Sequence, residues 1–216
     1  MPSQGRCAFL SCKNQGVKFM ADQKQVDLLK QGVKAWNAWR QENPSIIPDL
    51  EEAEFTSADL TSVNLRDANL TGATLDNANF TGARLSGANL SGANLQAAWL
   101  YSADLRKANL SGANLTNATL EIANLRSANL RSANLQAASC TRANLIRADL
   151  SDANLTEADL ANATFIGSCL DRADLHSAYL PSANFTGADL IEADFTGADV
   201  DDAIFRDVDK TGAIGI

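Results

Sequence analysis

Histidine is almost absent from this sequence, because His176 is the only one in 216 residues. General bases and metal sites most often use histidine, so its scarcity argues against both kinds of chemistry. The cysteines and carboxylates show no metal-ligand clustering in the sequence, and no hydroxyl has a nearby base. We expect His176 to be a solvated surface residue. The sequence therefore predicts a protein that is not an enzyme and that holds no cofactor and no metal.

Cysteine is scarce too, and the four present do not form a disulfide framework. Cys140 takes a position otherwise held by leucine and should point inward, whereas Cys169 takes an outward position. Cys7 and Cys12 lie in residues 1–21, which lack periodicity and which we expect to be a disordered leader. Free thiols of this kind favour a reduced, cytoplasmic protein.

Long apolar runs are missing as well, since no stretch approaches the ~18 apolar residues of a membrane span. The net charge of −8 argues against a general binder of nucleic acid or of anionic membranes. That charge is uneven along the chain: +4 in residues 1–48, −6 in 49–83, +5 in 84–147 and −12 in 148–209. An elongated fold would turn this gradient into acidic, basic and strongly acidic regions in space.

What the sequence has in abundance is a five-residue unit, such as Ala88-Asn89-Leu90-Ser91-Gly92. Units centred on every fifth position from Phe55 to Phe205 number 31, without insertion or deletion. The first position is Ala in 29 units, and the third is Leu in 23 and Phe in 6. Two apolar positions in five fit neither a helix nor a long alternating strand. Such a strict repeat predicts a solenoid, in which each unit buries its apolar residues by stacking on its neighbours.

The units match the consensus A(D/N)LXX, and in this the chain resembles the pentapeptide-repeat family over about three quarters of its length. The resemblance implies an all-β solenoid: a right-handed quadrilateral β-helix with one unit per side and 20 residues per coil. Residues 48–213 would then form about 8 coils, followed by a tail at 214–216, with ladders ~4.8 Å apart. Within that family, the chain resembles the members with an N-terminal helical cap that are seen in photosynthetic bacteria.

Residues 22–47 precede the repeat and carry a helical pattern. One amphipathic helix is predicted over roughly 22–41, with Asp22 as its N-cap and Pro44 just past its end. We expect this helix to cover the open apolar end of the first coil; a helix that binds a partner or a membrane surface is the alternative. The cap residues would be Val26, Leu29, Val33, Trp36 and Trp39.

Each position of the unit has a mechanical role. Asn or Asp holds the second position in 21 units, where a short polar side chain can hydrogen-bond the adjacent turn backbone. Gly or Asn at the fifth position suits a turn that needs positive φ, but charged occupants such as Lys107 and Glu157 do not, so we expect a mixture of turn types. Phe165, Phe185 and Phe205 lie 20 residues apart and should form one aromatic column.

Two departures from the repeat indicate candidate binding surfaces. Trp99, Tyr101 and Ile122 replace polar residues on one face, and Tyr179 recurs on that face four coils further on. Exposed Trp and Tyr are typical anchors of interfaces, although aromatic residues also occur on β-surfaces without binding anything. The second departure is a column of arginines, which is either a solvated basic surface or a site for an acidic partner. Its members are Arg66, Arg106, Arg126 and Arg206, with Arg84, Lys107 and Arg147 nearby.

We therefore expect a non-enzymatic rigid rod that presents flat faces for protein–protein binding, with an unidentified protein partner. The resemblance offers an alternative: family members that protect gyrase from quinolones imitate DNA, and the acidic residues 148–209 could do the same. The basic middle third and the uninterrupted repeat depart from those members. An ice-binding face is less favoured, because its threonine column is interrupted. The rod is expected to bind no nucleic acid directly and to be a monomer or an end-to-end homodimer through its C-terminal coil.

Overall fold

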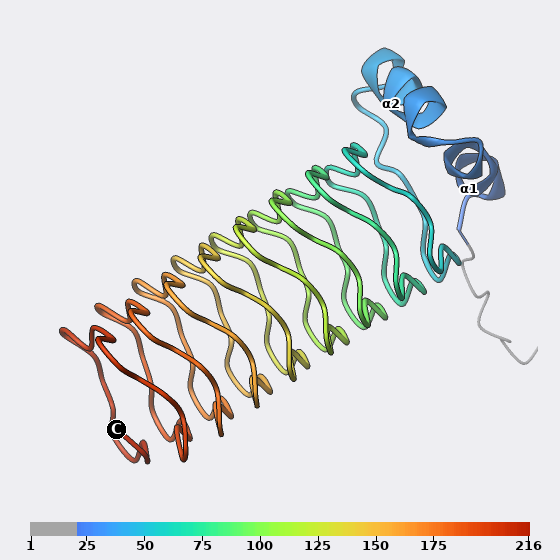
Figure 1. Ribbon diagram of the computed structural model, residues 1–216. Helices are drawn as coiled ribbons and strands as arrows, with labels where there is room; N and C mark the ends of the chain where they lie inside the picture. The colour runs from blue at the N-terminus through green and yellow to red at the C-terminus, as the bar shows by residue number, and fades with distance from the viewer. Residues whose placement is uncertain (1–20) are drawn as a thin grey trace, which may run out of the picture.

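The computed structural model describes residues 21–216, and these form a rod of stacked coils (Figure 1). Two helices lie at one end of the rod, and the C-terminus lies at the other. The predictions about the leader and about Cys7 and Cys12 concern residues 1–20, outside the described part. Neither helix among the described residues is long and apolar enough to span a membrane.

The coils are held in register by parallel bridges between residues 20 positions apart. The bridges begin with Asp49 to Asn69 and end with Asp194 to Ile214, and a bridging residue recurs at every fifth position between. Four five-residue units therefore complete one coil. Each unit adds a short bridged segment and a two-residue turn, so the chain forms ladders between coils without long strands.

The interior is filled by the first and third residues of each unit. Leu90 and Ala93, for example, are both 0% exposed. The predicted aromatic column is present: the Phe165 and Phe185 rings stack with centroids 4.6 Å apart, and Phe185 and Phe205 follow at 5.0 Å. These separations match the ladder spacing of a sheet, so the ring column follows the backbone register.

The fifth residues of the units are uniform in φ, and the expectation that charged occupants avoid positive φ is wrong. The fifth residue of every unit from Glu52 to Gly212 has φ between 53° and 75°, in the left-handed region. Lys107, with φ of 58°, shows why charged residues conform: its N–H donates to Arg126 O in the next coil at 3.0 Å. Hydrogen bonding between coils therefore overrides the local preference of these residues for negative φ.

Outside the core, second-position side chains form polar ladders. Asn109 Nδ2 donates to Asn89 Oδ1 at 2.9 Å, and Asn129 Nδ2 donates to Asn109 Oδ1 at 3.0 Å. Asn109 Oδ1 also accepts from the N–H of Ser111 at 3.2 Å, which confirms the predicted bond to the turn backbone. The side chain thus ties its own turn to the coil before it.

The N-terminal region contains two helices, α1 (Gln23–Lys30) and α2 (Val33–Glu42), and the single predicted helix is wrong. The break lies at Gly32, whose φ of 119° is available to glycine but strained for other residues. Asp22 caps α1 as predicted, because its side chain accepts a hydrogen bond from the N–H of Lys24.

Both helices pack on the first coil through the predicted apolar residues. Val26, Leu29 and Trp36 are buried in the cluster that continues into the rod. Val33 and Trp39 are partly buried against the same cluster. The helices therefore lie over the apolar cross-section at this end of the rod.

Polar side chains of α2 also pair with backbone groups that have no earlier coil to bond. Trp36 Nε1 donates to Asn64 O at 2.9 Å, and the N–H of Asn64 donates to Asn37 Oδ1 at 2.8 Å. Arg40 is 7% exposed, and its Nη2 donates to Arg66 O at 3.1 Å. Elsewhere in the rod, the equivalent backbone groups are bonded to the preceding coil. In the first coil, the side chains of α2 take the place of that coil.

Candidate partner-binding surfaces

Three of the four predicted surface apolar residues lie together, and we call Trp99, Tyr101 and Ile122 the aromatic patch. They are 59%, 43% and 42% exposed. Trp99 bridges to Thr119 in the next coil, and the N–H of the residue after Tyr101 donates to the carbonyl of the residue before Ile122. The patch therefore spans two adjacent coils.

Tyr179 shares the Trp99 column but does not join the patch. It is 49% exposed, and the bridges from Trp99 run through Thr119, Ser139 and Asp159 before they reach it. Four coil steps of ~4.8 Å place the two aromatic residues ~19 Å apart along the rod. A partner would need to extend over five coils to contact both.

The predicted arginine column lies at turn positions and includes an open depression of about 450 Å³. Ser86 lies between Arg66 and Arg106 in this column, and its short side chain leaves the gap. Arg206 belongs to the same column but stands four coils beyond Arg126, outside the depression. The residues that line the depression are Arg66, Asp67, Ser86, Arg106, Lys107, Arg126 and Ser127.

Arg106 is held in place by an ion pair with Asp104. Its Nε and Nη2 donate to the two carboxylate oxygens at 2.7 and 2.8 Å. The hydrogen bond from Arg106 keeps the pKa of Asp104 below its usual value, and the same contact raises the pKa of Arg106. Both side chains therefore stay charged at neutral pH, and the guanidinium is fixed against the wall of the coil.

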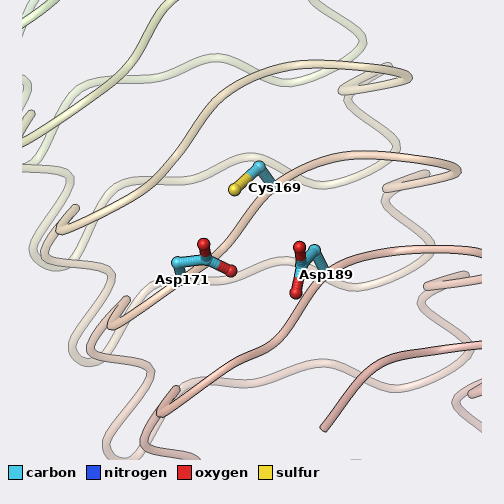
Figure 2. Close-up of side chains that lie close together, drawn as sticks. All are labelled: Cys169, Asp171 and Asp189. Atoms are coloured by element: carbon cyan, nitrogen blue, oxygen red, sulfur yellow. The ribbon is translucent and has the colours of Figure 1, made fainter. Parts of the chain in front are cut away.

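A cluster that the sequence analysis did not find lies near the C-terminal end. Figure 2 shows the side chains of Cys169, Asp171 and Asp189 close together, and one ligand atom from each lies within 4.8 Å of the others. The offset of 20 between Cys169 and Asp189 is the signal that could have revealed it, because residues 20 apart face each other in neighbouring coils. Three donors fall short of the four that a structural zinc site uses.

The carboxylates of this cluster are poorly solvated. Asp171 Oδ1 and Asp189 Oδ1 are buried and, among the described residues, have no hydrogen-bond partner. Burial, followed by the charge of Asp171, raises the pKa of Asp189. A raised folded-state pKa means that ionisation of Asp189 disfavours folding, so its contribution to stability is lost as pH rises through that pKa.

The other candidate chemical groups are inert or exposed. Cys140 is 1% exposed, as predicted for an inward position, and burial raises its pKa to about 12. Its thiol therefore stays protonated at neutral pH. His176 is exposed, as predicted. Its backbone N–H donates to Asp174 Oδ1 at 2.9 Å and its carbonyl accepts from Glu157 N at 3.0 Å, whereas its imidazole makes no hydrogen bond within residues 21–216.

Comparison with protein families and solved structures agrees with this architecture. The sequence model described as "Pentapeptide repeats" matches in 8 copies that together cover residues 49–207. HetL, a pentapeptide repeat protein involved in heterocyst differentiation regulation from the cyanobacterium Nostoc sp. strain PCC 7120, is 34% identical; the match covers 76% of this chain and 88% of HetL, with a TM-score of 0.32.

A trypsin-treated form of QnrB1, a plasmid-mediated fluoroquinolone resistance protein, is 19% identical over 74% of this chain and 84% of its own, with a TM-score of 0.56. That likeness concerns the fold alone. A search among curated proteins finds no match. Pentapeptide-repeat proteins are right-handed quadrilateral β-helices and are typically non-enzymatic structural or interaction proteins. With the family model matching more than half of its length, this chain belongs to the pentapeptide-repeat family.

Proposed function

We propose that this protein is a non-enzymatic rod whose flat sides bind another protein. The observation that carries the proposal is the aromatic patch, in which Trp99 is 59% exposed on a surface of otherwise small and polar residues. Exposed Trp and Tyr supply a large share of interface binding energy when a partner covers them. Nothing in the fold requires an indole at this position, because the same column holds Thr119 and Ser139.

The rod is well suited to present such a patch. Trp99 N donates to Ala78 O at 2.9 Å and its carbonyl accepts from Phe80 N at 2.7 Å, so the backbone on which the ring stands is bonded to the coil before it. A surface that is rigid before binding loses little conformational entropy when the partner docks. The patch therefore combines apolar area with preorganisation.

We further infer that α1 and α2 serve as the cap of the first coil and that the repeat forms about 8 coils. The bonds from Trp36 and Arg40 to the first-coil backbone support the cap, because they satisfy groups that would otherwise invite another strand. We also propose a cytoplasmic location, based on the buried free thiol of Cys140.

The test replaces the aromatic patch and measures partner capture. Trp99→Ala with Tyr101→Ala should leave the thermal unfolding temperature nearly unchanged while it reduces recovery of bound proteins from the native lysate at least tenfold. The matched control is Thr119→Ala with Thr141→Ala, which changes the same two columns one and two coils further on. Equal capture by the wild type and the aromatic variant would remove the patch as the binding site.

A second candidate function is supported by the acidic region. Residues 148–209 carry 14 acidic and 2 basic side chains, so this part of the rod could imitate DNA toward an enzyme such as DNA gyrase. The basic residues of the middle third do not fit this imitation. A supercoiling assay with gyrase, with and without a quinolone, tests the idea; unchanged activity at micromolar rod would end it.

A further inference from the structure

The four corners of the rod differ in charge, and one of them stands out as basic. Each corner is a column of turn pairs, and the corner that follows the units centred on Leu65, Leu85 and Leu105 carries six basic and two acidic side chains between residues 66 and 207. Each of the other three corners carries more acidic than basic side chains. The first has one basic and three acidic, the second has two basic and five acidic, and the third has no basic and two acidic. We call this column the basic corner: Arg66, Asp67, Arg106, Lys107, Arg126, Arg147, Arg206 and Asp207.

The depression of about 450 Å³ lies along the N-terminal half of the basic corner. Lys107 and Arg126 border it and make no ion pair within residues 21–216, so their charges are available. Arg106 is fixed by Asp104 through two of its nitrogens, which leaves Nη1 able to donate. With Arg66, four cations therefore converge on a gap that Ser86 leaves open, beside one carboxylate, that of Asp67.

The length of the depression points to an extended occupant. Arg66 and Arg126 are three coils apart, or ~14 Å at the ladder spacing, which four to five residues of extended chain span. Beyond Arg126 the corner continues with Ile146 and with Ile166, which is 38% exposed. The surface thus passes from basic to apolar along the rod.

We propose that the basic corner binds an acidic, extended segment of the partner protein, whose carboxylates pair with Arg66, Lys107 and Arg126 and whose end places an apolar residue on Ile166. This inference rests on the proposed function and names the partner chemistry. Charge complementarity selects carboxylates, and the excess of acidic side chains at the other three corners disfavours a broad polyanion such as a DNA duplex or an anionic membrane.

A binding assay with a defined probe tests this assignment. The probe is a fluorescein-labelled peptide of about five glutamates followed by two leucines, and fluorescence anisotropy reports its affinity. The full-length Lys107→Glu variant should bind the peptide about fivefold more weakly than the wild type, and addition of Arg126→Glu should weaken binding a further fivefold. Raising the salt concentration should reduce the wild-type affinity.

Arg142→Glu is the matched control, because Arg142 and Lys107 have the same place in the turn, with φ of 59° and 58°. It makes the same charge change at another corner and should alter affinity less than twofold. Circular dichroism of each variant checks that the fold is intact. Equal weakening by both substitutions, no binding of the peptide by the wild type, or tighter binding of a DNA duplex or of anionic vesicles would each overturn the proposal.

The proposed function can survive a failure of this inference. If Trp99→Ala with Tyr101→Ala loses its protein partner while Lys107→Glu with Arg126→Glu retains it, the rod still binds protein, and the basic corner is not the site. If only the Lys107→Glu with Arg126→Glu variant loses the partner, the result supports the basic corner as the binding site and excludes the aromatic patch.

Discussion

At the scale of single residues, most fifth positions of the repeat hold a side chain in a backbone region that favours glycine. Of the 33 such positions from Glu52 to Gly212, 24 are not glycine. A residue with a Cβ in the left-handed region costs about 1–2 kcal/mol. The cost is met because the N–H of each fifth residue from Glu52 to Glu192 is bonded to the next coil, as Ala137 N is to Thr156 O at 2.9 Å.

Because of this strain, we expect substitution by glycine to change the free energy of unfolding in opposite directions at two neighbouring alanines. Ala137 is exposed with φ of 54°, so Ala137→Gly should raise the free energy of unfolding by about 0.5–1 kcal/mol. Ala138 is 0% exposed, and Ala138→Gly should lower it by about 1.5 kcal/mol, since a buried methyl is lost and the unfolded chain gains freedom. Urea unfolding measures both, and shifts of the same sign would contradict the explanation.

At the scale of elements, the N-terminal helices pack on the first coil and bond to its backbone, as the proposed cap requires. Trp36 is 0% exposed and donates to Asn64 O, whereas Trp39 is partly buried and its ring lies 5.1 Å from that of Trp36. The indole of Trp36 thus contributes packing and a hydrogen bond to an open backbone edge. Gly32 lets the chain bend between the helices so that both contact the first coil.

Replacement of the two tryptophans by phenylalanine should therefore lower the free energy of unfolding by different amounts. Trp36→Phe leaves the carbonyl of Asn64 without its buried donor and should lower the free energy of unfolding by about 2 kcal/mol. Trp39→Phe removes an indole N–H that has no partner among the described residues and should lower it by less than about 1 kcal/mol. Urea unfolding followed by circular dichroism compares them. Similar losses for both would show that Trp36 acts through packing alone.

At the scale of the whole molecule, the two ends of the rod are treated differently. The N–H groups of Val200 and Phe205 donate to no backbone carbonyl in residues 21–216, and Phe205 is only partly buried. No helix covers this end in the described chain. Acidic side chains surround it, and we propose that their charge protects this edge.

Removal of that charge should cause association through the C-terminal end. The variant with Asp199, Asp201 and Asp202 all changed to Asn should form dimers or larger species at concentrations where the wild type is a monomer, as measured by sedimentation velocity. The control variant makes the same change in charge near the other end: Glu54→Gln, Asp59→Asn and Asp76→Asn. A triple Asn variant that sediments as a monomer at about 100 μM would show that charge does not guard this end.

The sequence alone determined the interior of this protein. Ala and Leu at two of every five positions can all be buried only if the units stack as a solenoid. The first-position Ala and third-position Leu residues from Leu60 to Leu190 are buried as that argument requires. The apolar residues of the N-terminal segment were identified in the same way. The arginine column followed once the resemblance supplied a coil of 20 residues.

Only the tertiary structure decided which surface residues act together. Arg66, Arg106 and Arg126 border one depression because Ser86 leaves a gap between their coils, and Cys169 meets Asp189 because bridges join residues 20 apart. The tertiary structure also decided the break between the helices at Gly32 and the uniform positive φ of the fifth residues. Hydrogen bonds between coils, formed only when four units close a turn of the rod, override local preference, and no local pattern in the sequence records them.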